Sequence, residues 1–264
     1  MIKSILIAST LALVAAAGIS GVASAQQSSK GPPRSNRANN VVLVHGAFAD
    51  GSGWRGVYNE LTKRGYRVTI VQNPLTSLAD DVAATKRVLA RQDGPAILVG
   101  HSYGGTVITE AGDDPKVAGL VYVSALAPDV GQSTGDQFAE IPAPSTFVIE
   151  PQADGFGFVN MAKFKLGFAG DTSDADAAFL RDSQVPIAMS IFGTKVTHAA
   201  WRTKPSWAVV ATEDAAIDPK LLRSTAKRIG ATTVEVKGSH VVFLTQPKAV
   251  ADVIDQAAQG AGKR

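Results

Sequence analysis

The sequence predicts an α/β fold in which a mostly parallel central sheet is covered by helices on both faces. Short β-branched runs alternate along the chain with stretches of helical periodicity, as they do in layered α/β proteins. The first run, NVVLV at residues 40–44, is almost entirely apolar, which is typical of a strand buried on both faces. The chain has 264 residues, 45% of them hydrophobic, and this is enough for one sizeable domain.

Six strands are expected in the sheet, and helices are expected between them. The strand candidates lie at 40–44, 66–71, 96–100, 117–124, 207–212 and 232–236. The helix candidates lie at 78–91, 219–229 and 247–258, and the last two begin at proline, which the first helical turn tolerates. Ser77 is the expected N-cap of the first, whose Asp80 and Asp81 favour the positive end of the helix dipole.

The N-terminal 39 residues are expected to lie outside the domain formed by residues 40–264. Residues 1–25 carry one lysine, an apolar run and a final Ala-Ser-Ala, the pattern of a secretory signal peptide. The apolar run, residues 5–17, is shorter than the roughly 20 residues that span a bilayer, so no stable membrane anchor is expected after cleavage. Residues 26–39 are polar and rich in Ser and Pro, which indicates a flexible leader. The predicted location is periplasmic or secreted.

Composition excludes several functional classes. The formal net charge of +3 is small and scattered, so no nucleic-acid partner is expected. The chain has no cysteine, which rules out disulfides, a thiol nucleophile and a thiolate metal site. No H-x-H or H-E-x-x-H spacing occurs, so we expect neither a metal nor a cofactor. The sequence does not indicate an oligomeric state.

A long insertion interrupts the alternation of strands and helices at about residues 125–204. Eight of the ten phenylalanines lie there. We interpret the segment as a cap over the active face of the sheet, in which most phenylalanines form a small core and a few line an apolar pocket.

The strongest chemical signal is Ser102. Residues Gly100-His101-Ser102-Tyr103-Gly104 match G-x-S-x-G, with a strand before the motif and a helix after it. Such a turn is strained and crowded, so larger side chains two residues either side of the serine would clash. It also exposes the hydroxyl and places the Tyr103 amide at a helix N-terminus, where an anion is favoured. Ser102 is the predicted nucleophile.

The nucleophile needs a base, and His240 is the predicted one. It lies in a loop after the last strand candidate, at the sheet edge where Ser102 is expected. His101 should point away from the serine, whereas His45 ends the first strand and His198 lies in the insertion.

The base needs an acid that orients its ring, and Asp214 is favoured because it follows the strand candidate at 207–212. Glu213 and Asp218 are close rivals. Glu213 can continue the strand and turn outward, and Asp218 precedes Pro219 as a helix cap would.

A second oxyanion donor is expected just after the first strand. Gly46 allows the backbone to bend, so that the Ala47 amide faces the Tyr103 amide. Phe48, the next residue, is the expected substrate-binding side chain.

One rival motif is GSGWRG at residues 51–56, a literal G-x-G-x-x-G. It begins seven positions after Val44, too late for the tight turn of a dinucleotide site, and Gln72-Asn73 stands where an acidic ribose ligand is required. These glycines more readily shape the oxyanion loop.

The run LVHGAF…GW, the elbow GHSYGGTV, the segment ATEDAAI and the closing GSHVVFLTQP together resemble the α/β-hydrolase superfamily, most of all its compact esterase and hydroxynitrile-lyase-like branch. The resemblance covers about residues 40–258. It implies an eight-stranded sheet, a cap, a triad of Ser102, Asp214 and His240, and oxyanion donors at Ala47 and Tyr103.

Two departures bear on the reaction. The lyases carry threonine where this chain has Gly46, and lysine where it has Val241. The chain lacks both of these lyase residues, which favours ester hydrolysis. The predicted activity is cleavage of small to medium, partly apolar carboxylic esters through an acyl-enzyme. The alternatives are a lyase or perhydrolase of the same fold and a catalytically inactive binding protein.

Overall fold

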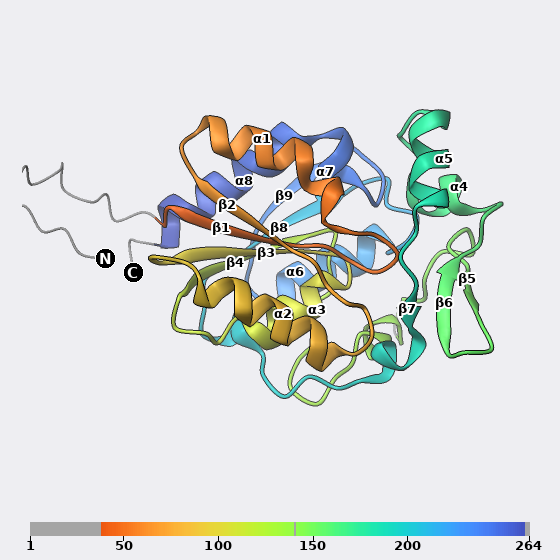
Figure 1. Ribbon diagram of the computed structural model, residues 1–264, viewed down its shortest axis with the longest axis horizontal. Helices are drawn as coiled ribbons and strands as arrows, with labels where there is room; N and C mark the ends of the chain where they lie inside the picture. Colours follow the sequence, from red (N-terminus) through yellow and green to blue (C-terminus); the bar gives the residue numbers. More distant parts are fainter. Residues whose placement is uncertain (1–37, 140, 262–264) are drawn as a thin grey trace, which may run out of the picture. The chain divides into compact units, whose positions relative to one another are not determined.

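The computed structural model describes residues 38–139 and 141–261, and a six-stranded parallel sheet forms their centre (Figure 1). The strand order is β2-β1-β3-β4-β8-β9. The strands are β1 (Asn40–Val44), β2 (Arg67–Val71), β3 (Ala96–His101), β4 (Val117–Val123), β8 (Ser206–Ala211) and β9 (Thr232–Val236). Strands β1, β3 and β8 are buried along their whole length, as their apolar sequences predict. The predicted fold class is confirmed.

The sheet has the six strands that the apolar runs predict, and the eight implied by the family resemblance are not found among the described residues. Three further strands exist there, but they belong to a separate sheet of order β5-β6-β7. The reason is strand pairing: within the described residues β5 and β7 pair only with β6, and none of the three strands pairs with a strand of the central sheet.

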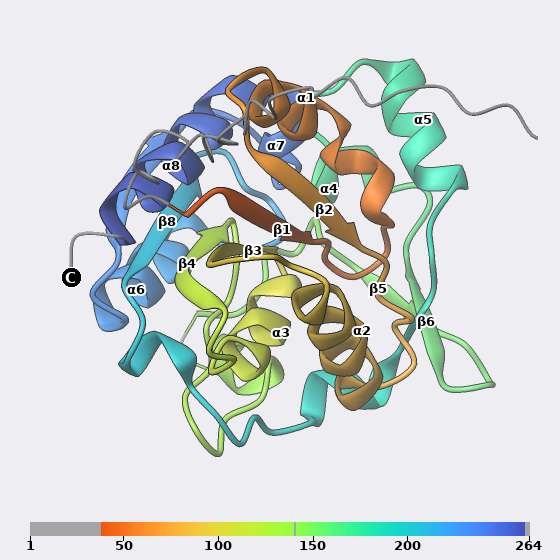
Figure 2. The same ribbon diagram turned by 60° about the vertical axis from the view of Figure 1, so that its left-hand side comes forward.

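Helices cover both faces of the sheet (Figures 1 and 2). One face carries α1 (Arg55–Lys63) and α8 (Pro247–Gly260), and the other carries α2 (Leu78–Ala90), α3 (Gly104–Ala111) and α6 (Pro219–Arg228). Two predicted caps are confirmed, because Ser77 accepts the Asp80 amide and Asp218 accepts the Lys220 amide. The short α7 (Val242–Thr245) lies between β9 and α8, preceded by the loop that carries His240.

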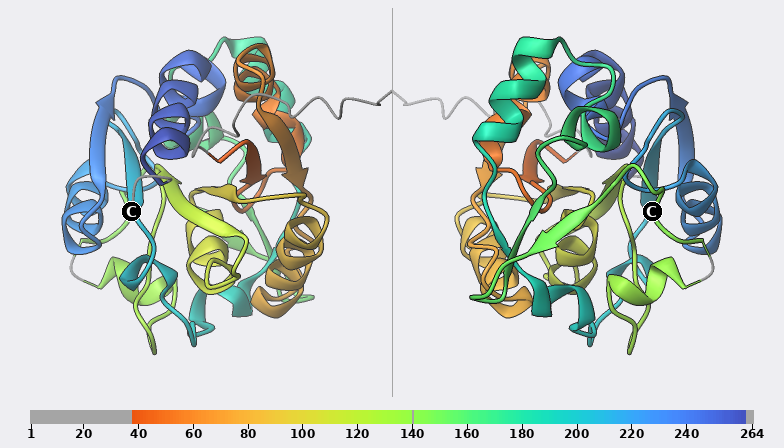
Figure 3. Two further views of the ribbon diagram at one scale, coloured as in Figure 1. Left: turned by 90° about the vertical axis from the view of Figure 1, so that its left-hand side faces the viewer. Right: turned by 90° about the vertical axis from the view of Figure 1, so that its right-hand side faces the viewer.

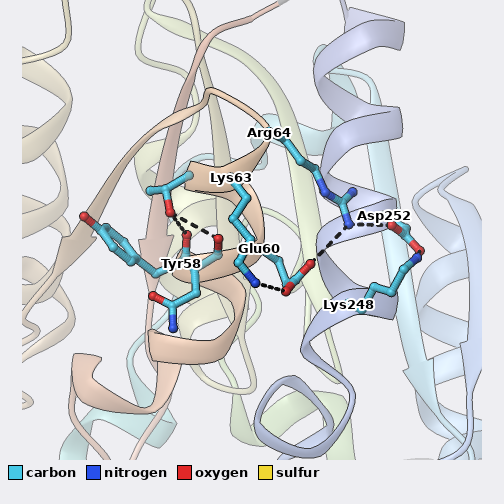
Figure 4. A network of polar contacts seen from close by, with 8 residues as sticks. Tyr58, Glu60, Lys63, Arg64, Lys248 and Asp252 are labelled. Atoms are coloured by element: carbon cyan, nitrogen blue, oxygen red, sulfur yellow. Dashed lines mark hydrogen bonds and ion pairs between the residues drawn. The ribbon is translucent and has the colours of Figure 1, made fainter.

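Helices α1 and α8 lie side by side, and charged side chains join them (Figure 4). Arg64, the C-cap residue of α1, lies 2.7 Å from Asp252 of α8, which also pairs with Lys248 at 2.9 Å. Within α1, Lys63 pairs with Glu60 at 3.1 Å. These groups are partly exposed, so each pair contributes no more than about 1 kcal/mol, and the helices are held mainly by their buried apolar faces.

The segment between β4 and β8 lies beyond the carboxyl ends of the central strands (Figure 1; Figure 3, right). It holds β5 (Ile149–Pro151), β6 (Phe156–Val159), α4 (Phe164–Phe168), α5 (Asp174–Asp182) and β7 (Ile187–Ala188). Short 3-10 turns complete it. We call this segment the cap.

The predicted signal peptide at 1–25 and nearly all of the predicted leader at 26–39 lie outside the described residues. Among the helices that are described, none combines the length and apolarity needed to cross a bilayer.

Candidate active site

Ser102 lies on a sharp turn between β3 and α3. Its backbone has φ of 53°, in the left-handed region that costs a residue with a side chain about 1–3 kcal/mol. Two hydrogen bonds hold this conformation: the Ser102 amide donates to the Val123 carbonyl at 3.2 Å, and the Ser102 carbonyl accepts the Gly105 amide at 2.9 Å. The turn is therefore fixed by the neighbouring strand and by the first turn of the helix.

The two glycines of the motif are required by close backbone approach. A Cβ at position 100 would lie 2.4 Å from the Gly104 carbonyl oxygen, and a Cβ at position 104 would lie 2.8 Å from the Val44 carbonyl oxygen. The clashes predicted from the sequence are thus present, one within the turn and one against β1.

Ser102, His240 and Asp214 form one chain of hydrogen bonds. The His240 Nε2 lies 2.9 Å from the Ser102 Oγ, and the His240 Nδ1 lies 2.8 Å from Asp214 Oδ2. His240 and Asp214 are buried. A carboxylate accepts only, so Nδ1 carries the proton and donates to Asp214, which leaves Nε2 free to accept the serine proton.

Backbone amides fix the acid. Asp214 Oδ1 accepts the amides of Ala216 and Ile217, both at 2.8 Å, so the whole carboxylate is occupied. The rival carboxylates lie elsewhere, because Glu213 is exposed beside Lys237 and Asp218 caps α6. Of the three acidic candidates, Asp214 is the one that contacts His240.

The other histidines have separate roles. His101 Nε2 donates to the His240 carbonyl at 2.9 Å, and burial holds the pKa of His101 well below its ordinary value, so this ring is neutral. His45 is also buried, accepts the Asn73 amide at Nε2 and donates from Nδ1 to the Gly46 carbonyl. His198 is exposed on the cap and pairs with Glu110 of α3.

Ala47 and Tyr103 line the same cavity as Ser102. Neither backbone amide donates to another group within the described part of the chain. Tyr103 is the N-cap of α3, so its amide lies where the helix dipole favours negative charge. Both amides are thus available to a bound group next to the serine.

The Tyr103 side chain shows a feature that sequence reasoning missed. Its hydroxyl donates to the buried Asp81 Oδ2 at 2.7 Å, while Asp81 Oδ1 accepts the Leu75 amide at 2.8 Å. We expected Asp81 to serve the helix dipole, but it faces the core, where burial raises the pKa of its carboxyl. The sequence signal for this burial was the position of Asp81 in α2, one turn before Thr85, which is buried on the same helix face.

An apolar cavity of about 320 Å³ opens at Ser102 and His240. Five phenylalanines line it, and among the described residues that line it none is Asp, Glu, Lys or Arg; the five are Phe48, Phe138, Phe147, Phe168 and Phe192. Phe48 packs on Phe192 with ring centroids 6.4 Å apart. Four of the eight cap phenylalanines thus line the cavity. Phe48, the side chain expected to bind substrate, lines it together with them.

The cap is tied directly to the loop that carries His240. Asp171, between α4 and α5, accepts hydrogen bonds from Ser239 and from Thr245, and these bonds keep the pKa of Asp171 low despite its partial burial. The Phe168 ring meets the His240 ring edge-on at 5.0 Å. The cap therefore contributes to the position of the histidine.

Comparisons with known proteins identify the family and the fold. Residues 41–253 match the model of the alpha/beta hydrolase family. A pyrethroid hydrolase of Sphingobium wenxiniae is 28% identical over an alignment of 245 residues that covers 81% of this chain and 85% of the relative. A carbendazim hydrolyzing esterase of Nocardioides is 37% identical over an alignment of 108 residues that covers 36% of this chain and 45% of the relative. An extracellular alpha/beta-hydrolase of a Paenibacillus species has a similar fold, with a TM-score of 0.71, 22% identity and coverage of 84% of this chain and all of that one.

Proposed function

Because this chain belongs to the alpha/beta hydrolase family, we propose that it is a serine hydrolase that cleaves carboxylic esters through an acyl-enzyme. The observation that carries the proposal is the chain of hydrogen bonds from Ser102 through His240 to Asp214, at 2.9 and 2.8 Å. It ends at a serine on a strained turn that faces a cavity. A pyrethroid hydrolase and a carbendazim hydrolyzing esterase among the relatives support the same reaction class.

The mechanism follows from the hydrogen-bond directions. Ser102 Oγ attacks the ester carbonyl carbon while His240 Nε2 takes its proton, and Asp214 stabilises the imidazolium that forms. The amides of Ala47 and Tyr103 hold the negative oxygen of the tetrahedral intermediate, where the loss of one donor costs about 2.7–4 kcal/mol. His240 then protonates the leaving alcohol and activates the water that releases the acid.

The cavity indicates the substrate. Phenylalanine rings bind apolar groups, and the described residues that line the cavity include no Asp, Glu, Lys or Arg to pair with a charged acyl or alcohol group. A volume of about 320 Å³ lies at the lower end of small-molecule sites. The proposed substrates are therefore uncharged esters of small to medium size with an apolar part.

Export is part of the proposal, and it rests on residues 1–25 alone. Their signal-peptide pattern supports cleavage after Ala25. Amino-terminal sequencing of protein recovered from outside the cytoplasm should then begin at Gln26, and an intact Met1 there would contradict cleavage.

The test of the activity is turnover of p-nitrophenyl acetate and butyrate by the mature protein, with and without EDTA. Ser102→Ala should abolish turnover and fluorophosphonate labelling while the protein stays folded, and EDTA should have no effect, because the mechanism uses no metal. Ser124→Ala is the matched control, since Ser124 is a buried serine at the end of β4, also with positive φ, but does not line the cavity. Absence of both turnover and labelling in the wild type would favour an inactive binding protein.

A further inference from the structure

We propose that Asp81 is a positioning residue for the oxyanion site, acting through the Tyr103 side chain. Tyr103 supplies one of the two amides that the proposed function assigns to the oxyanion, so the inference rests on that function. Asp81 lies in the first turn of α2 and does not line the cavity around Ser102. It therefore acts on the reaction only through its contacts.

The first argument is that Asp81 is buried without an opposite charge. Its side chain is fully buried, and within the described residues it forms no ion pair with Lys, Arg or His. Each carboxylate oxygen accepts one hydrogen bond, from the Tyr103 hydroxyl at 2.7 Å and from the Leu75 amide at 2.8 Å. Taking a carboxylate out of water is unfavourable, so these two bonds are what hold it in place.

Helix capping does not explain this burial. The adjacent Asp80 already serves the N-terminus of α2, because it is exposed and bonded to Ser77 and Thr76. An acidic residue that only interacts with the helix dipole remains in water, as Asp80 does. The Asp81 side chain instead points into the core, where it accepts the hydrogen bond of the Tyr103 hydroxyl.

The second argument is where the tyrosine lies. Tyr103 is the residue after Ser102, which has φ of 53°, and its ring is buried with its hydroxyl on Asp81. A strained turn persists only where its surroundings determine it fully. The bond to α2 fixes the far end of the Tyr103 side chain, so it limits rotation of the peptide whose N–H faces the oxyanion.

The third argument is that the same carboxylate reaches the cap. Leu75, which donates to Asp81, has φ of 59°, and its carbonyl accepts the Ala188 amide of β7 at 2.9 Å. Met189, the next residue, lines the cavity. Asp81 thus joins the nucleophile turn, the loop before α2 and one wall of the substrate cavity.

The experiment measures kcat and KM for p-nitrophenyl butyrate in Asp81→Asn, Tyr103→Phe and the double variant, with active sites counted by fluorophosphonate titration. Each single change should lower kcat about ten- to a hundredfold, less than loss of a whole oxyanion donor, and leave KM within about twofold. Because the two residues act as a unit, the double variant should lose about as much as either single one.

Tyr122→Phe is the matched control, because it also removes a buried tyrosine hydroxyl, which bonds to Thr109 at 3.0 Å away from the cavity. It should lower the Tm and keep wild-type kcat. If Asp81→Asn keeps wild-type kcat per titrated site and only lowers the Tm, the inference is overturned while the proposed function stands. A wild type without Ser102-dependent turnover would overturn the proposed function and the inference together. If Asp81→Asn fails to fold, Tyr103→Phe alone decides by the same criterion.

Discussion

Gly46 is the position at which one added methyl group should most directly disturb the proposed oxyanion site. Gly46 follows β1 and precedes Ala47, so its backbone carries the loop that faces the nucleophile. A Cβ placed there would lie 2.8 Å from Ser102 Cβ, 3.0 Å from the His101 carbonyl oxygen and 3.1 Å from His101 Nδ1. All three neighbours are backbone or rigid side-chain atoms, so the loop itself has to move.

The size of the movement follows from these distances. Ordinary van der Waals contact begins at 3.4 Å, so Gly46→Ala must separate the loop from Ser102 by about 0.6 Å. A displacement of about 1 Å in a catalytic group costs about a hundredfold in rate, so we expect kcat to fall about ten- to a hundredfold. Overpacking should also lower the free energy of unfolding by about 1–3 kcal/mol.

The assay is kcat on p-nitrophenyl butyrate per titrated active site, together with thermal unfolding. Gly94→Ala serves as the control, because a Cβ there would meet only Asn40 Nδ2 at 3.6 Å, an ordinary contact far from Ser102. Wild-type kcat in Gly46→Ala would refute the reasoning, since the loop would then tolerate a shift without effect on the oxyanion. Gly46→Thr, which introduces the residue of the lyases, should reduce kcat further.

Two further predictions concern pH and substrate size. The pKa of the buried His101 lies well below 6.5, so as the pH falls the imidazole is protonated in the unfolded chain before it is protonated in the folded protein. The contribution of His101 to the free energy of unfolding is therefore complete above pH 6.5 and decreases below it by up to about 1.4 kcal/mol per pH unit. Thermal unfolding between pH 7.5 and 5.5 should show this loss. His101→Gln, whose amide still donates to the His240 carbonyl, should reduce the loss without abolishing it, because burial also lowers the pKa of His45. An unchanged slope in His101→Gln would assign the proton elsewhere. Phe147→Ala enlarges the cavity and should shift the kcat/KM ratio of octanoate to butyrate esters about tenfold toward octanoate, whereas Phe156→Ala, outside the cavity, should not.

The sequence was sufficient for the sheet and for the residues at its carboxyl edge. Each of the six runs marks its strand to within one residue at either end. The inner strands are recognisable because buried parallel strands are apolar, and the edge strands β2 and β9 because they are rich in β-branched residues. Ser102 and His240 were expected to lie together because parallel strands end at the same edge of a sheet, and their side chains lie 2.9 Å apart. Asp214 was separated from Asp218 because a proline one residue on indicates a helix cap.

The cap could not be predicted in the same way. Its strands have three, four and two residues, too few for any periodicity to appear, and within the described residues they pair antiparallel with each other alone. Asp81 lies in the first helical turn as expected, but its buried contact with Tyr103 was missed for a different reason. Its partner Tyr103 lies 22 residues away, and an aspartate in the first turn of a helix has the same local pattern whether it faces water or the core.

The central claim, that Ser102 carries the acyl group, is tested most directly by trapping the intermediate. Wild-type protein mixed with p-nitrophenyl butyrate, quenched in acid within the first turnover and mapped by mass spectrometry should carry one butyryl group on the peptide that contains Ser102. The same treatment of Ser102→Ala should give no adduct and no burst of p-nitrophenol. An adduct on another residue, or a burst that persists in Ser102→Ala, would contradict the account.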